Sequence, residues 1–218
     1  MVSVIIPAYN EAERIADTVR AVQTIPQVDE IIVVDDGSSD NTAEAAALGG
    51  VRVIRLPQNC GKGEALTAGV AVARGDVLMF LDADLGETAQ HAGALLEPVL
   101  KGDVDMTIAV LPPAQRKGGA GFVLRAAREG IKRATGFEPT APLSGQRALT
   151  RALMDRIGKI ESGFGVEVAL TIDALRAGAR VGEVPVPFRH RETGRDWRGV
   201  LHRAKQWWHV RRALKKRK

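Results

Sequence analysis

Cysteine is almost absent from this sequence. Cys60 is the single cysteine in 218 residues, so the chain can form no internal disulfide. No group of cysteines and histidines has the spacing of zinc ligands, which argues against a structural zinc module. A chain without disulfides suits a reducing compartment, and we expect a cytoplasmic protein.

Long apolar runs are absent as well. The run at residues 2–6 lacks the basic start and the length of a secretion signal. The other apolar runs have the length of strands, far short of the roughly 20 residues that span a bilayer. We therefore expect a soluble protein whose contact with a membrane, if any, is peripheral.

Two phosphate-binding motifs are also missing. The chain contains no Gly-x-x-x-x-Gly-Lys-Ser/Thr, and no Gly-x-Gly-x-x-Gly follows its first apolar run. These absences argue against a P-loop NTPase and against a dinucleotide-dependent dehydrogenase.

Negative charge is scarce only at the C-terminal end. Residues 195–218 contain ten Lys/Arg and one Asp, so the net charge of +5 leaves about −4 on residues 1–194. In this basic segment, apolar residues including Trp207 and Trp208 recur at helical spacing. An amphipathic basic helix suits an anionic membrane surface, or packing of its tryptophans on the domain. Nucleic acid is the least favoured partner.

The order of the apolar runs predicts the fold class. Runs rich in β-branched residues predict strands over 2–6, 30–34, 51–56, 77–81, 105–110 and 180–188, the last as an edge strand. Helical periodicity covers 11–23, 41–48, 63–73, 88–100, 121–135, 150–157 and 166–177. This alternation predicts an α/β domain over residues 1–194, with a mainly parallel sheet and helices on both faces, followed by the helix 195–218.

Acidic residues follow three of the expected strands. Glu11 comes after the first, Asp35 and Asp36 after the second, and Asp82 and Asp84 after the fourth. Ligands of open parallel sheets bind beyond the carboxyl ends of the strands, so these acids are expected to meet at one edge.

Asp82 and Asp84 are candidate metal ligands. Their carboxylates, two residues apart after an apolar run, could bind one Mg²⁺ or Mn²⁺ that neutralises a diphosphate leaving group. The alternative interpretation is a helix cap beside a solvated acid.

Two further segments suggest a nucleotide site. Asp36, followed by Gly37, could accept a hydrogen bond from a nucleobase, although Asp and Gly are also ordinary turn residues. Lys62 opens an expected helix, where it could contact a phosphate or remain an exposed lysine.

These segments together resemble family 2 glycosyltransferases and their GT-A relatives. Residues 2–11 resemble the opening strand of that family, 33–40 its nucleotide-binding turn, 59–63 a following glycine-lysine segment, and 82–84 its Asp-x-Asp metal motif. The resemblance implies a GT-A (Rossmann-like) fold and contacts to a nucleotide sugar from Pro7, Tyr9, Glu11, Asp36, Lys62, Asp82 and Ala83.

The second half resembles two branches of that superfamily, the polyprenyl-phosphate sugar synthases and the glucosyl-3-phosphoglycerate synthases. The segment 142–147 resembles an acceptor loop, which implies acceptor contacts from Ser144, Gly145 and Arg147. The segment 163–167 resembles the start of the next helix, where Glu167 could act as a catalytic base or be an ordinary helix N-terminal acid. By the same resemblance His190 is a third metal ligand, or else part of a solvated basic loop.

The function predicted in this way is transfer of a hexose from a nucleoside diphosphate sugar, with Mg²⁺ or Mn²⁺ as cofactor and Asp84 and Glu167 as the catalytic residues. The resemblance favours UDP-glucose over GDP-mannose, and it implies a phosphorylated small molecule or a polyprenyl phosphate as the anionic acceptor. A non-catalytic module that binds nucleotide sugar or nucleic acid is the alternative. A homodimer and the stereochemical course stay open.

Overall fold

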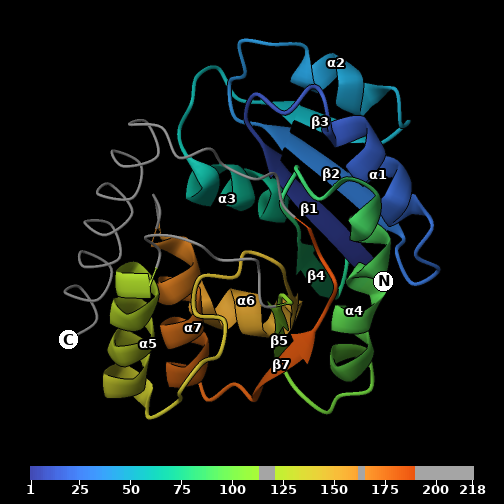
Figure 1. Ribbon diagram of the computed structural model, residues 1–218. Helices are drawn as coiled ribbons and strands as arrows, with labels where there is room; N and C mark the ends of the chain where they lie inside the picture. The colour runs from blue at the N-terminus through green and yellow to red at the C-terminus, as the bar shows by residue number, and fades with distance from the viewer. Residues whose placement is uncertain (113–120, 162–164, 190–218) are drawn as a thin grey trace.

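The computed structural model describes residues 1–112, 121–161 and 165–189. Its centre is a sheet with the strand order β3-β2-β1-β4-β6-β5-β7. The strands are β1 (Val2–Ala8), β2 (Glu30–Asp35), β3 (Arg52–Arg55), β4 (Val77–Phe80), β5 (Met106–Val110), β6 (Arg147–Thr150) and β7 (Val181–Pro185). Figure 1 shows this sheet with helices packed on both sides.

The sheet is mainly parallel, as the sequence predicts. β1 pairs in parallel with β2 and β4, β2 with β3, and β5 with β7. β6 is the exception, because it runs antiparallel to both β4 and β5. The segment expected to be a loop over residues 142–147 therefore ends one residue earlier, because Arg147 is the first residue of β6. A strand of four residues that begins with a charged side chain shows too little alternation of apolar and polar residues to be recognised from the sequence.

The helices agree with the expected segments. They are α1 (Ile15–Gln23), α2 (Thr42–Ala47), α3 (Lys62–Val72), α4 (Gly93–Leu100), α5 (Gly121–Thr135), α6 (Arg151–Ile157) and α7 (Val166–Arg176). The expected helix 88–100 divides into a 3-10 segment, η1 (Gly86–Ala92), and α4.

Each face of the sheet has its own core. Val4 and Ile6 of β1 lie in the cluster that contains the apolar face of α1 and α4, whereas Ile5 lies in the cluster with α3, α6 and α7. This alternation is the period of a strand buried on both faces. A third cluster packs α5 against α7, and Figure 1 shows α5 outside α7.

Some expectations concern residues outside the described ones. His190, the boundary at residue 194 and the amphipathic helix 195–218 all lie there, so these stay predictions. Within the described ranges, no helix is long and apolar enough to cross a membrane.

Candidate active site

The carboxyl ends of β2, β1 and β4 lie side by side, because these three strands are parallel neighbours. The loops that follow them leave from one edge of the sheet, as the sequence predicts. Pro7 is the last but one residue of β1, and Tyr9, which follows that strand, is exposed. Both therefore lie one strand away from the loop of Asp82 and Asp84.

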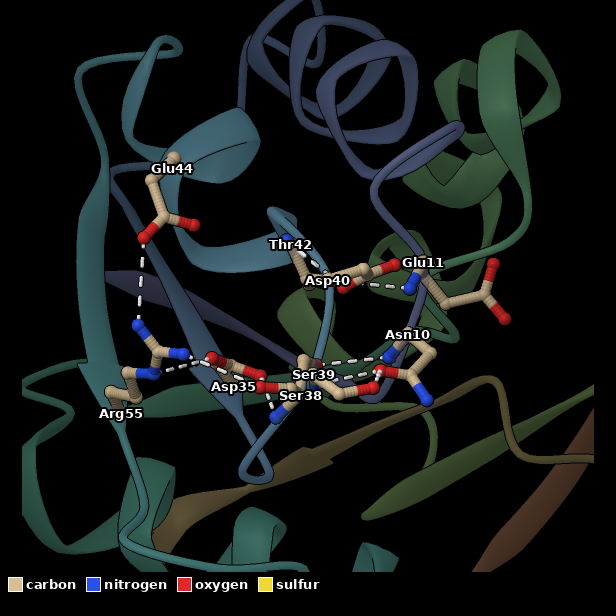
Figure 2. Close-up of polar contacts among 9 residues, drawn as sticks. All are labelled: Asn10, Glu11, Asp35, Ser38, Ser39, Asp40, Thr42, Glu44 and Arg55. Atoms are coloured by element: carbon tan, nitrogen blue, oxygen red, sulfur yellow. Dashed lines mark hydrogen bonds and ion pairs between the residues drawn. The ribbon is translucent and has the colours of Figure 1, made fainter.

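The loop after β1 is bonded to the loop after β2 (Figure 2). The Asn10 N–H donates to Ser38 Oγ at 2.9 Å, and the Ser39 N–H donates to Asn10 Oδ1 at 2.9 Å. The Glu11 N–H donates to Thr42 Oγ1 at 2.9 Å. Asn10 has a φ of 55°, a left-handed conformation that asparagine tolerates better than most residues. The backbone around Glu11 is thus held in place by the neighbouring loop.

Asp35 stabilises the turn after β2. Its side chain is fully buried, and Oδ1 accepts the Ser38 N–H at 3.0 Å. Oδ2 lies 3.3 Å from Nε of Arg55, which also donates to the Ser38 carbonyl and lies near Glu44 (Figure 2). This turn sets the direction of the next residue, Asp36.

Asp36 reaches the loop that precedes α3. Its two carboxylate oxygens accept the N–H groups of Cys60 at 2.7 Å and Gly61 at 2.8 Å. Gly37 is required for this approach, since it has a φ of 69° and an added Cβ would lie 2.5 Å from the Gln58 carbonyl carbon. Each carboxylate oxygen can accept a second bond, so the nucleobase contact of Asp36 stays a prediction.

We expect Asp36→Ala to weaken binding of the nucleotide sugar by about 1–3 kcal/mol, because the buried carboxylate that accepts the Cys60 and Gly61 N–H groups is lost. Calorimetry with UDP-glucose and GDP-mannose measures the effect. A base contact predicts a loss that differs between the two donors, whereas a loop-holding role alone predicts equal losses. Unchanged affinity for both would contradict both roles.

Lys62 connects three segments of the chain. It begins α3, and its Nζ lies 2.6 Å from Asp82 Oδ1 and 3.0 Å from Glu167 Oε1. Gln146 Nε2 donates to the other Asp82 oxygen. The side chains of Lys62, Asp82 and Glu167 are 30%, 27% and 15% exposed. We refer to Lys62, Asp82, Gln146 and Glu167 as the lysine cluster.

The two carboxylates keep Lys62 charged. Burial alone would lower the pKa of Lys62, but Asp82 and Glu167 raise it well above the ordinary lysine value. Because the pKa of Lys62 is raised in the folded state, the stabilisation that this cluster gives the fold is present below the ordinary lysine pKa. It is lost only as the pH rises above that value. Lys62 therefore supplies a positive charge at neutral pH.

Helix α1 holds the backbone of the Asp-x-Asp segment. Buried Thr18 donates through Oγ1 to the Ala83 carbonyl at 2.8 Å and accepts the Gly86 N–H at 2.8 Å. Arg14 donates to the Asp84 carbonyl at 3.2 Å. Ala83 is buried, and its small side chain lets this backbone lie close to α1, while its predicted contact with a nucleotide sugar stays a prediction. Sequence reasoning missed Thr18, a polar residue on the apolar face of α1.

The carboxylates of Asp82 and Asp84 are suitable ligands for Mg²⁺ or Mn²⁺ bound together with a phosphate. Lys62 and Gln146 engage both oxygens of Asp82, which favours Asp84 as the main metal ligand. No group of three or more His, Cys, Asp or Glu that could hold a metal occurs in the part of the chain the structure describes. Mg²⁺ is commonly held by only one or two carboxylates plus substrate phosphates, so two suffice.

Charged side chains hold the loop between α5 and β6. The Glu183 carboxylate, from β7, accepts the N–H groups of Thr140 and Ala141, both at 2.9 Å. Arg128, from α5, donates to the Pro139 carbonyl at 2.9 Å. The expected acceptor loop is thus fixed at its start before it reaches the lysine cluster.

Gly145 lies directly against Lys62 and Asp82 of the lysine cluster. A Cβ added there would clash with Lys62 Nζ and would lie 3.0 Å from each carboxylate oxygen of Asp82. Ser144 is buried and donates to Gln146 Oε1 at 3.2 Å, and Arg147 is only 1% exposed. Sequence reasoning predicted roles for the neighbours of Gln146 but none for Gln146. An amide side chain inside this predicted acceptor loop was the feature that could have identified it.

The family is decided by comparison with known proteins. The model of glycosyl transferase family 2 matches residues 3–158. The chain belongs to this family. The family predicted from the sequence is therefore confirmed, and the match covers the four motifs of the N-terminal half from residue 3 onward.

Curated relatives of two kinds are similar to this chain. A glucosyl-3-phosphoglycerate synthase of Mycolicibacterium paratuberculosis is 32% identical over 198 residues, 80% of this chain and 60% of that protein. An undecaprenyl-phosphate 4-deoxy-4-formamido-L-arabinose transferase of Pseudomonas fluorescens is 34% identical over 164 residues, 71% of this chain and 48% of that protein. The chain spans about three fifths of the length of the first of these relatives.

A solved structure confirms the GT-A fold. The glucosyl-3-phosphoglycerate synthase of Mycobacterium tuberculosis, in complex with Mn²⁺, UDP and phosphoglyceric acid, matches with a TM-score of 0.83 and 27% identity, over 100% of this chain and 78% of that one. The same enzyme has also been solved with Mg²⁺ and UDP.

Proposed function

We propose that this chain transfers a hexose from a nucleoside diphosphate sugar to an anionic acceptor, with Mg²⁺ or Mn²⁺ as cofactor. One observation carries the proposal: the lysine cluster joins the end of β4, the starts of α3 and α7 and the loop before β6, and its Asp82 comes two residues before Asp84. The cluster carries one positive and two negative side chains at the carboxyl edge of a parallel sheet, so together with Asp84 it suits a divalent cation that binds an anionic nucleotide.

Each part of the site has a role in this reaction. Asp84, with Asp82 beside it, would hold the metal, which when bound neutralises charge on the departing diphosphate. Lys62 adds a fixed positive charge, and Gly145 leaves room for it. Glu167 would accept the proton of the acceptor hydroxyl in an inverting reaction, whereas a retaining reaction requires no base at that position.

The finer part of the proposal is UDP-glucose as donor and a phosphoglycerate-type molecule as acceptor. It is supported by the similarity to the mycobacterial glucosyl-3-phosphoglycerate synthases, whose structures contain UDP with phosphoglyceric acid. A polyprenyl phosphate is the alternative acceptor, supported by the undecaprenyl-phosphate transferase. Peripheral membrane contact through residues 195–218 and a homodimer belong to this finer part.

The test is release of UDP from UDP-glucose. We expect release to require Mn²⁺ or Mg²⁺, to stop with EDTA, and to rise when phosphoglycerate is added. GDP-mannose and a short-chain polyprenyl phosphate serve as competing donor and acceptor. Nucleotide-sugar binding without release, under every combination, would support the non-catalytic alternative instead.

A further inference from the structure

Arg147 is a buried cation without an ion pair. It is the first residue of β6 and 1% exposed, and none of the ion pairs among the described residues includes it. One of its terminal nitrogens, Nη2, is buried and has no hydrogen-bond partner among the residues that the structure describes. A buried and incompletely satisfied guanidinium is costly, so its contacts need an explanation other than stability.

Its remaining nitrogens connect the two segments that complete the lysine cluster. Nε donates to the carbonyl of Ser144 at 3.0 Å, directly before Gly145. Nη1 donates to Thr171 Oγ1 at 2.8 Å, and Thr171 Oγ1 donates to the Glu167 carbonyl at 2.8 Å. Arg147 therefore ties the Gly145 loop to the turn of α7 that carries Glu167.

Arg147 is also fixed relative to the third segment of the cluster. In the antiparallel pairing of β4 with β6 it lies opposite Phe80, two residues before Asp82. The end of β4, the Gly145 loop and the start of α7 thus share one anchor. The cluster leaves little tolerance, since Gly145 has no room for a Cβ and Glu167 is 3.0 Å from Lys62.

We propose that Arg147, acting with Thr171, is a positioning residue that holds Gly145 and Glu167 in register with Lys62 and Asp82. This inference rests on the proposed transferase function, and it assigns Arg147 an indirect role in place of direct acceptor contact. The guanidinium acts from behind the site, through backbone and hydroxyl groups.

The charge state of Arg147 agrees with this role. Burial lowers the pKa of Arg147 to about 10, while the charges of Glu167 and Glu183 oppose that shift. The guanidinium is therefore protonated at neutral pH and can donate both bonds at once. A lysine at this position could not reproduce the planar fork.

Thr171→Val is the sharpest variant, because it removes the hydroxyl between Arg147 and Glu167 and keeps a similar side-chain size. Thr107→Val is its matched control: Thr107 Oγ1 is equally buried but donates to the Leu95 carbonyl, under α4. We expect Thr171→Val to lower kcat about 10- to 100-fold, the effect of misplacing reacting groups, with the donor KM changed less than about threefold. Thr107→Val should leave kcat unchanged.

Arg147→Met should lower kcat at least as much as Thr171→Val, and Arg147→Lys should restore part of the loss. Amide hydrogen exchange, measured without substrate, should accelerate in residues 143–147 and 165–168 in Thr171→Val but not in Thr107→Val. If Thr171→Val loses thermal stability like the control while its kcat stays at the wild-type value, Arg147 is only a packing residue and the proposal is overturned.

Different measurements would contradict the transferase function and the positioning role of Arg147. A wild-type protein that transfers no sugar from any donor contradicts the transferase function, whatever the variants do. Hydrogen exchange at 143–147 and 165–168 still measures whether Arg147 and Thr171 hold these segments. Unchanged exchange there in Thr171→Val would refute the positioning role independently of activity.

Discussion

Asp84→Ala is expected to abolish metal-dependent transfer, lowering kcat/KM by about 10³-fold or more, since a metal at a diphosphate contributes several kcal/mol to the transition state. Asp82 alone is not expected to make up for the loss, because Lys62 and Gln146 already bind its two oxygens and one carboxylate gives the metal fewer ligands than two. Donor binding measured by calorimetry should also lose its dependence on Mn²⁺. UDP release and calorimetry together measure the effect.

Asp155→Asn provides the control for Asp84→Ala, because Asp155 is exposed in α6 and has no part in the site. It should retain wild-type activity and the same response to Mn²⁺. Full activity of Asp84→Ala would exclude the metal role assigned to Asp84.

Gly145→Ala is expected to lower transfer about 100-fold, the scale of a misplacement by about 1 Å, while the protein stays folded. The new methyl group would clash with Lys62 Nζ and press on both Asp82 oxygens, so Lys62 must leave its position between Asp82 and Glu167. The steady-state rate of UDP release measures the loss, and a circular dichroism melt checks the fold.

Gly121→Ala is the matched control, because an added Cβ at Gly121 meets nothing within 4 Å. This variant should keep wild-type activity and stability, since Gly121 is an exposed first residue of α5 and the added methyl group meets no described atom within 4 Å. Wild-type activity in Gly145→Ala would show that the close contact between the loop and the lysine cluster is not needed for transfer.

The first half of the site was predictable from the sequence. Asp36, Asp82 and Asp84 follow apolar strand runs directly, and the carboxyl ends of parallel neighbours meet at one edge. Lys62 was predicted at the start of a helix, but its partners were not. Lys62 and Glu167 are 105 positions apart, and local periodicity carries no information about contacts over such a separation.

The second half of the site was harder to predict from the sequence. The short strand β6 has no clear alternation, so its antiparallel place between β4 and β5 was missed. Without this strand, the sequence did not show that the Gln146 amide points toward Asp82 or that Arg147 is buried. A segment of mixed polarity can be a loop or a strand, and only its neighbours in space decide.

The sequence by itself determined the α/β alternation, the two-faced burial of the strands and the acids at the strand ends, because these follow from side-chain period and from the chemistry of single residues. The tertiary structure alone decided that Lys62 lies between Asp82 and Glu167, that Gly145 lies against Lys62 and Asp82, and that Arg147 lies behind the site. These are contacts between distant segments, and their distances are set by how helices and loops pack on the sheet.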